Sequence, residues 1–291
     1  MDRQNRVNFA GLILPQWERI DRYNIFTVSP YRDYDIEDKD RIMDERGWSS
    51  LYYSDVNYSG LILSPILRFV QIVDANSLAG YQDITHDMLL DAEQVIGSHE
   101  SEWVSVSDTS GYYVFPKNSP WYLDGVEVPV NEVAIFGSTL VRAFLASGSE
   151  WYLLRALRMW ERWKGFIVED AFGYIAYPYF TVDALWVWDE LDNVSVNTPV
   201  FKPENRDTYE VFHKAALTLD FLILLEQAKK GTTVKYLEEF YYLMAAALHT
   251  NSLIAAFPRV MGFGYPLNSH HASLPFGFGG WVRLAQQNEL F

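Results

Sequence analysis

Hydrophobic residues recur at helical spacing in seven segments of the 291-residue chain. In the second of them Ile84, Met88 and Val95 fall on one stripe, as apolar positions three or four residues apart do in an amphipathic helix. The segments are 61–73, 83–96, 131–147, 150–166, 209–228, 234–249 and 279–288. This pattern predicts a mostly α protein.

The spacing of the segments predicts helical hairpins. Within a pair the linker is short and contains Gly148 or Gly231, whereas the loops between pairs are long. The first helices recur about every 70 residues, near Tyr58, Asn131, Tyr209 and Pro275. Stacked hairpins place all short turns at one end and all long loops at the other. We therefore expect an α/α toroid, a partial or complete ring whose inner layer is built from the first helices. A plain helical bundle or solenoid is the alternative.

Residues 1–291 are interpreted as a single domain. The stretch 1–58 lacks clear periodicity, and no linker composition separates it from the rest. We expect it to form an irregular N-terminal region packed on the helices. Because the hairpins predicted here make an incomplete ring, closure by this region or by a second subunit is open, and so is a homo-oligomer.

The long loops are rich in aromatic and carboxylate side chains, and they would meet at one mouth of the ring. Aromatic faces bury the C–H patches of sugars, while carboxylates, Asn and His bind the hydroxyl groups. Alternatively, the aromatic residues only fill a wide helical ring. The side chains expected to bind substrate are Trp121, Asn131, Glu132, Tyr179, Trp186, Trp188, Glu190, Tyr265, Asn268 and His271.

A pattern of turn and helix residues surrounds the second hairpin. It comprises Pro129, Asn131, Gly137, the Ser147-Gly148 turn and Tyr152-Leu153-Leu154-Arg155-Ala156. The pattern resembles six-hairpin carbohydrate enzymes, above all the helical domain of D-glucuronyl C5-epimerases, and more loosely the α/α-toroid polysaccharide lyases and glycosidases. Its motifs are mainly structural. The resemblance therefore implies a toroid and a carbohydrate substrate more than a particular reaction.

Glu210 and His213 are the leading candidates for catalysis. Residues three apart share a helix face, so both side chains are expected to point into the mouth from the start of an inner helix. A neighbouring carboxylate raises the pKa of an imidazole toward the range of proton transfer. Tyr113 and Tyr177 are candidates for a second acid or base. The alternative is a Glu favoured by the helix dipole beside a packed His.

Charge and composition exclude several classes of binding partner and cofactor. The net charge of −15 repels nucleic acid and anionic membranes. The chain has no Cys, and His270-His271 lacks further ligands at metal-binding spacing, so we expect no metal and no cofactor. Neither a signal peptide nor a membrane span is predicted, because the apolar runs are too short. We expect a soluble, cytoplasmic protein whose partner is a saccharide substrate.

Three functions remain open. The leading expectation is a lyase or C5-epimerase that removes a proton next to the carboxylate of a uronate in a poly- or oligosaccharide. The second is a glycoside hydrolase with paired carboxylates, for which Glu132, Asp189, Glu190 and Glu210 are candidates. The third is a non-catalytic glycan-binding or assembly protein.

Overall fold

The computed structural model of the chain describes residues 54–116, 125–169, 175–181, 210 and 212–240, and two short strands at 7–9 and 12–14. In both strands, and at 169, 175–176 and 212–213, only the backbone is described. The predicted last helix, 279–288, lies outside the described residues, as does most of the N-terminal region 1–58. The predictions for these two segments stay predictions.

Helices make up most of the described chain, which confirms a mostly α fold. The long helices are α3 (Val56–Ala75), α4 (Gln82–Ser98), α5 (Val130–Ser147), α6 (Glu150–Lys164) and α7 (Phe212–Ala228). The chain is helical again over 234–240. Each of these helices covers most or part of a segment in which the sequence shows helical periodicity.

Short antiparallel hairpins and 3-10 turns complete the described chain. The paired strands are β1 (Val7–Phe9) with β2 (Leu12–Leu14), β3 (Trp103–Ser105) with β4 (Gly111–Tyr113), and β5 (Val168–Glu169) with β6 (Ile175–Ala176). In register, Trp103 lies opposite Tyr113 and Val168 lies opposite Ala176. The 3-10 turns are η3 (Ala79–Tyr81) and η4 (Glu100–Glu102). The second and third strand pairs lie in loops between the predicted hairpins.

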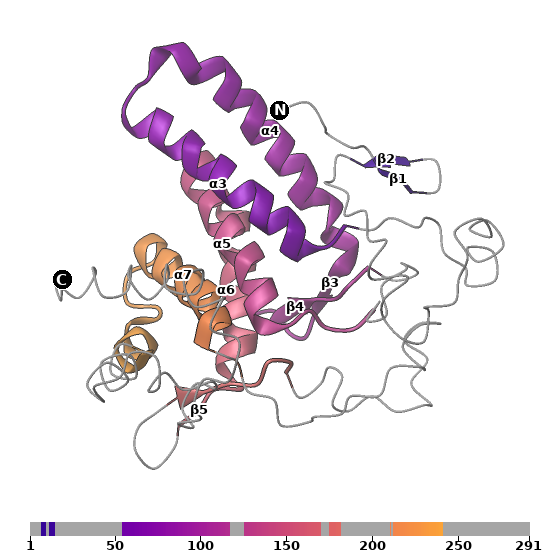
Figure 1. Cartoon of the computed structure of the whole chain (residues 1–291), viewed down its shortest axis with the longest axis vertical. Coiled ribbons are helices and arrows are strands. Elements are labelled where there is room, and N and C mark those ends of the chain that lie inside the picture. The colour runs from indigo at the N-terminus through magenta and orange to yellow at the C-terminus, as the bar shows by residue number, and fades with distance from the viewer. Residues whose placement is uncertain are drawn as a thin grey trace.

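The helices are arranged as stacked hairpins (Figure 1). Helix α5 packs between α3 and α7, while α4 and α6 pack on the first helix of their own pairs. The turn between α3 and α4 has Ser77 at φ 50°, and the next two turns have Gly148 at φ 73° and Gly231 at φ 86°. Glycine adopts this left-handed conformation with little strain and therefore often follows a helix. The predicted hairpin breaks at Gly148 and Gly231 are confirmed.

Burial agrees with an inner layer for two of the three first helices. In α5 every residue from 134 to 143 is buried, and in α7 Leu219 and Leu222 are fully buried. Helix α3 differs, because Leu61 and Ile72 on its outer side are exposed. Within the described chain α4 and α5 pack on only part of the surface of α3, so the prediction that α3 belongs to an inner layer stays a prediction.

Helix α3 is also, within the described part of the chain, the one helix long and apolar enough to cross a membrane. Its buried side includes Val56, Leu63 and Leu67, which belong to the hydrophobic core cluster together with residues of α4, α5 and α7. A helix that buries one apolar side against other helices behaves as a core helix of a soluble protein. The side of α3 that faces α4 and α5 is packed as in the core of a globular protein.

Candidate functional site

The first turns of α5 and α7 are tied together by the short segment 177–181. The N–H of Val130, at the start of α5, donates to the carbonyl of Tyr179 at 3.0 Å. The N–H of Glu210, just before α7, donates to the carbonyl of Tyr177 at 3.0 Å. First-turn N–H groups have no acceptor within their own helix, so the Val130 bond supplies one. The segment thereby brings side chains from a long loop onto two helix N-termini.

Three half-buried side chains meet at this place. The ammonium group of Lys214 donates to the hydroxyl of Tyr179 at 3.0 Å, and the hydroxyl of Tyr179 donates to Oε1 of Glu132 at 3.3 Å. Lys214 lies in the first turn of α7, where a cation opposes the helix dipole. Contact with the Tyr179 ring, 4.1 Å from Nζ to the centroid, offsets part of that cost. We call Glu132, Tyr179 and Lys214 the tyrosine site.

Fully buried polar groups lie close to the tyrosine site. Glu210 and Tyr177 are buried, and burial raises the pKa of the Tyr177 hydroxyl well above its ordinary value, with the Glu210 charge adding to the rise and Thr218 opposing it. Asn131, in the first turn of α5, is also buried, and its Oδ1 has no hydrogen-bond partner. Such an unpaired acceptor is unusual in a protein interior.

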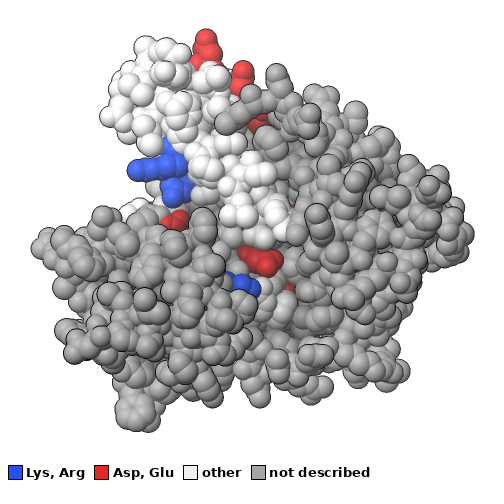
Figure 2. Space-filling model, viewed as in Figure 1, with Lys and Arg blue, Asp and Glu red and all other residues white. Residues whose placement is uncertain are grey.

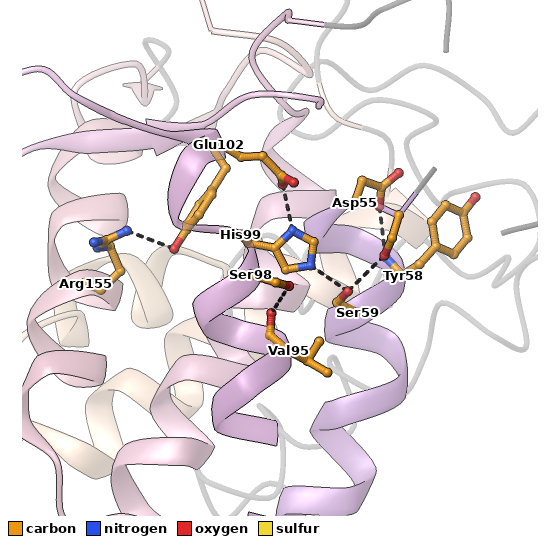
Figure 3. A network of polar contacts seen from close by, with 10 residues as sticks. Asp55, Tyr58, Ser59, Val95, Ser98, His99, Glu102 and Arg155 are labelled. Atoms are coloured by element: carbon orange, nitrogen blue, oxygen red, sulfur yellow. Dashed lines mark hydrogen bonds and ion pairs between the residues drawn. The ribbon is translucent and has the colours of Figure 1, made fainter. Parts of the chain in front are cut away.

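Another polar cluster lies where α3 begins and α4 ends (Figure 3). The hydroxyl oxygen of Ser59 is 2.7 Å from Nε2 of His99, and Nδ1 of His99 is 2.8 Å from Oε2 of Glu102. Ser59 and His99 are fully buried, and Glu102 is almost so. We call these three residues the serine relay. The sequence analysis did not identify it, although the spacing of His99 and Glu102 was a local signal for a pair.

Asp55 connects the two polar clusters. It caps α3 by accepting a hydrogen bond from the N–H of Tyr58 at 3.0 Å. Burial raises the pKa of Asp55 to about 7; the Tyr58 N–H lowers it, Glu132 and Glu102 raise it further, and His99 lowers it. Burial also raises the pKa of Glu102, against the lowering effect of His99. Asp55 therefore holds a proton at a pH where an exposed carboxyl is ionised.

Tyr113 lies apart from the other candidate catalytic residues. Its hydroxyl accepts a hydrogen bond from Nη1 of Arg155 at 3.1 Å, and Arg155 also binds Glu100 at 2.7 Å. Burial raises the pKa of Tyr113, while the charge of Arg155 lowers it. Its ring packs edge-on against Phe136, with 5.1 Å between centroids. These contacts place Tyr113 in the core between α5 and α6.

The structure thus brings five of the predicted site residues to one end of α5 and α7: Asn131, Glu132, Tyr177, Tyr179 and Glu210. His213 lies in the first turn of α7, where only its backbone is described. The remaining predicted residues lie outside the described chain, and their roles stay predictions; they are Trp121, Trp186, Trp188, Glu190, Tyr265, Asn268 and His271. Lys214 was missed because a lone lysine at a helix start carries no motif.

The surface and the comparisons add little that identifies the site. On the face drawn in Figure 2, acidic and basic side chains of the described chain lie near one another. Among the described residues, no three His, Asp or Glu side chains are grouped to hold a metal ion. Comparison of the chain with protein-family models, curated protein sequences and solved structures gives no match.

Proposed function

We propose that this protein is a carbohydrate-active enzyme that transfers a proton at a uronate, as a lyase or a C5-epimerase, with Tyr179 as the acid–base group. The observation that carries the proposal is the placement of the Tyr179 hydroxyl between the Lys214 ammonium and the Glu132 carboxylate. The charge of the Lys214 ammonium favours the ionised form of a neighbouring phenol, and the Glu132 carboxylate is placed to accept the phenolic proton. All three side chains are half-buried, so they remain within reach of a substrate.

The proposed reaction starts with Glu132 accepting the phenolic proton of Tyr179. The phenolate, held by Lys214, then takes the proton from the sugar carbon next to the carboxylate. Lys214 and the N-terminal ends of α5 and α7 stabilise the negative charge that develops. In a lyase the bond to the leaving glycosyl oxygen breaks, a carbon–carbon double bond forms, and Tyr179 gives the proton it took from carbon to the departing oxygen. In an epimerase a proton returns to the same carbon from the opposite face.

A glycoside hydrolase is the second candidate function. The raised pKa of Asp55 supports it. A protonated carboxyl with a pKa of about 7 beside a second carboxylate is the arrangement of a general acid and its partner. Glu132 would be that partner, because its charge acts on Asp55. The acidic character of this end suits a neutral glycan. We place proton abstraction first, because the Tyr179 hydroxyl contacts both Lys214 and Glu132 directly, whereas Glu132 acts on Asp55 only through its charge.

The toroid is part of the same proposal. It is supported by the order of α3, α5 and α7 in the described part and by the glycine turns at the ends of the hairpins. In such a ring the first turns of the inner helices would gather at one mouth. Asn131, Glu132 and Lys214 lie in the first turns of α5 and α7. The resemblance of the second hairpin to C5-epimerase helical domains points the same way.

We expect Tyr179→Phe and Lys214→Met to lower turnover of the active glycan by about 10² to 10⁴ fold, the usual contribution of a proton-transfer group. The matched controls are Tyr81→Phe and Lys230→Met, because both side chains are exposed near the turns of the hairpins. Each protein is incubated with a panel of uronate-containing and neutral glycans. Three products are followed: unsaturated uronate by ultraviolet absorbance, new reducing ends, and deuterium from solvent at the sugar carbon.

The products distinguish the candidate functions from one another. Unsaturated uronate identifies a lyase, and deuterium without cleavage identifies an epimerase. New reducing ends without unsaturation identify a hydrolase and move the assignment to Asp55 and Glu132. A folded Tyr179→Phe protein with the turnover of the wild type contradicts the role of Tyr179.

A further inference from the structure

We propose that Ser59, His99 and Glu102, the serine relay, form a second catalytic site that cleaves small acyl esters by nucleophilic attack of Ser59. The two contacts of the relay, 2.7 Å and 2.8 Å, are within hydrogen-bond distance. A hydroxyl bound to a base, which is itself oriented by a third group, is the geometry by which nucleophilic catalysis is recognised on any fold. Nothing in this inference depends on the tyrosine site.

The protonation state of Glu102 sets the direction of these hydrogen bonds. An ionised carboxylate only accepts, so with Glu102 ionised the proton between it and His99 sits on Nδ1. A neutral imidazole protonated at Nδ1 has a lone pair at Nε2, and the hydroxyl of Ser59 then donates to it. This is the polarity that general-base activation of a serine requires.

The three side chains are held by regular structure. Ser59 lies in the first turn of α3, His99 directly follows α4, and Glu102 ends η4. The imidazole also packs edge-on against Phe136, with 5.5 Å between ring centroids. A serine within a helix often bonds a backbone carbonyl of the preceding turn, whereas here its hydroxyl contacts a histidine 40 residues away in the chain. The fold therefore positions the relay from two separate helices.

The reaction balances with these groups and water. The Ser59 oxygen forms a bond to the acyl carbon while its proton passes to Nε2 of His99. The N–H groups of Tyr58 and Ser59 already bond Asp55, so the positive end of the α3 dipole is what stabilises negative charge on the acyl oxygen. The alcohol leaves with the proton from His99. Water then adds to the acyl group, giving its proton to His99, and the acid is released as Ser59 recovers the proton.

Burial sets the size of the substrate. Ser59 and His99 are fully buried, and the hydroxyl of Ser54 lies 3.4 Å from that of Ser59. An acyl group therefore reaches Ser59 only when neighbouring side chains move aside. We infer an acetyl group, the smallest common acyl unit, as the substrate class.

The test uses the full chain and two small reagents, 4-nitrophenyl acetate and methanesulfonyl fluoride. The wild type is expected to hydrolyse the ester and to gain one methanesulfonyl group on Ser59 with loss of fluoride, seen by mass spectrometry of the peptides. Ser59→Ala is expected to lose both ester hydrolysis and methanesulfonylation. Glu102→Gln is expected to slow both reactions by about 10² to 10⁴ fold. Ser98→Ala is the matched control, because its hydroxyl donates to the carbonyl of Val95 and not to the relay (Figure 3).

A wild-type protein that hydrolyses the ester no faster than Ser59→Ala, or that gains no adduct on Ser59, overturns the proposal. So does a folded Glu102→Gln protein that reacts at the rate of the wild type, since the relay is then only structural. His99→Ala, checked for folding by circular dichroism, gives a second measurement of the base. Tyr179→Phe is expected to react like the wild type, which keeps this test separate from the proposed glycan activity.

Discussion

Replacing Asp55 by asparagine is expected to stabilise the protein at pH 8 by about 4 kcal/mol and to change its stability little near pH 4. Asp55 is 1% exposed, and its pKa is raised from 3.8 to about 7, chiefly by burial. Above that pH the folded protein must keep a charge in its interior. Asparagine has no charge to bury, and it caps a helix about as well as aspartate.

The direction of the effect follows from proton binding. Between about pH 4 and pH 7 the folded protein holds the Asp55 proton, while the unfolded chain has released it. The contribution of this proton to the free energy of unfolding is complete below the pKa that Asp55 has in the unfolded chain. It is lost as the pH rises through the pKa that Asp55 has in the folded protein. The charges that face Asp55 come from Glu132, Glu102 and His99. The raised pKa of Glu102 acts in the same direction, so a smaller slope remains in the variant.

Urea unfolding at several pH values between about 5 and 8, followed by circular dichroism, measures this effect. The matched control is Asp87→Asn, because Asp87 is exposed on α4. The control is expected to keep the pH dependence of the wild type. An Asp55→Asn protein with that same pH dependence would show that Asp55 is ionised in the folded state.

Apolar periodicity predicted the helices because each of them buries one side or all sides against another helix. Helices α4, α5, α6 and α7 follow the predicted segments, and Gly148 and Gly231 mark the turns as expected. The exposure of α3 was not predictable in this way. Its sequence is as apolar as that of an inner helix, but burial depends on which neighbours cover it, and that information lies in other parts of the chain.

Five residues of the candidate site were predicted from the sequence, three of them at helix starts and two in an aromatic loop. Asn131, Glu132 and Glu210 were identified because they begin predicted inner helices, and the structure places them at one end. The serine relay was missed because Ser59 and His99 meet through tertiary packing across 40 residues. Tyr179 and Tyr177 look alike in sequence, yet only Tyr179 is half-buried. The two tyrosines differ in burial and therefore in chemistry, and burial cannot be read from the sequence.

The close approach of α3 and α5 makes Gly60 a costly glycine to replace. A Cβ atom on Gly60 would lie 2.8 Å from Cγ2 of Ile135, 3.0 Å from the backbone nitrogen of Phe136 and 3.1 Å from the backbone carbon of Ile135. Two of these atoms belong to the backbone of α5 and have no rotamer to change. The carbonyl of Gly60 also accepts a hydrogen bond from Thr139 of α5 at 3.1 Å, which holds the helices close.

We therefore expect Gly60→Ala to lower the free energy of unfolding by about 3 kcal/mol, the upper part of the range for overpacked cores. Gly97→Ala on α4 is the matched control: its Cβ meets nothing within 4 Å, and alanine favours a helix over glycine by up to about 1 kcal/mol. Gly137→Ala should fall between them, because its Cβ meets only the ring of Phe221, which can tilt. Urea unfolding of the three variants gives the order directly. If Gly60→Ala is as stable as Gly97→Ala, α3 and α5 do not meet at this crossing, and the convergence of Asp55 and Glu132 loses its structural basis.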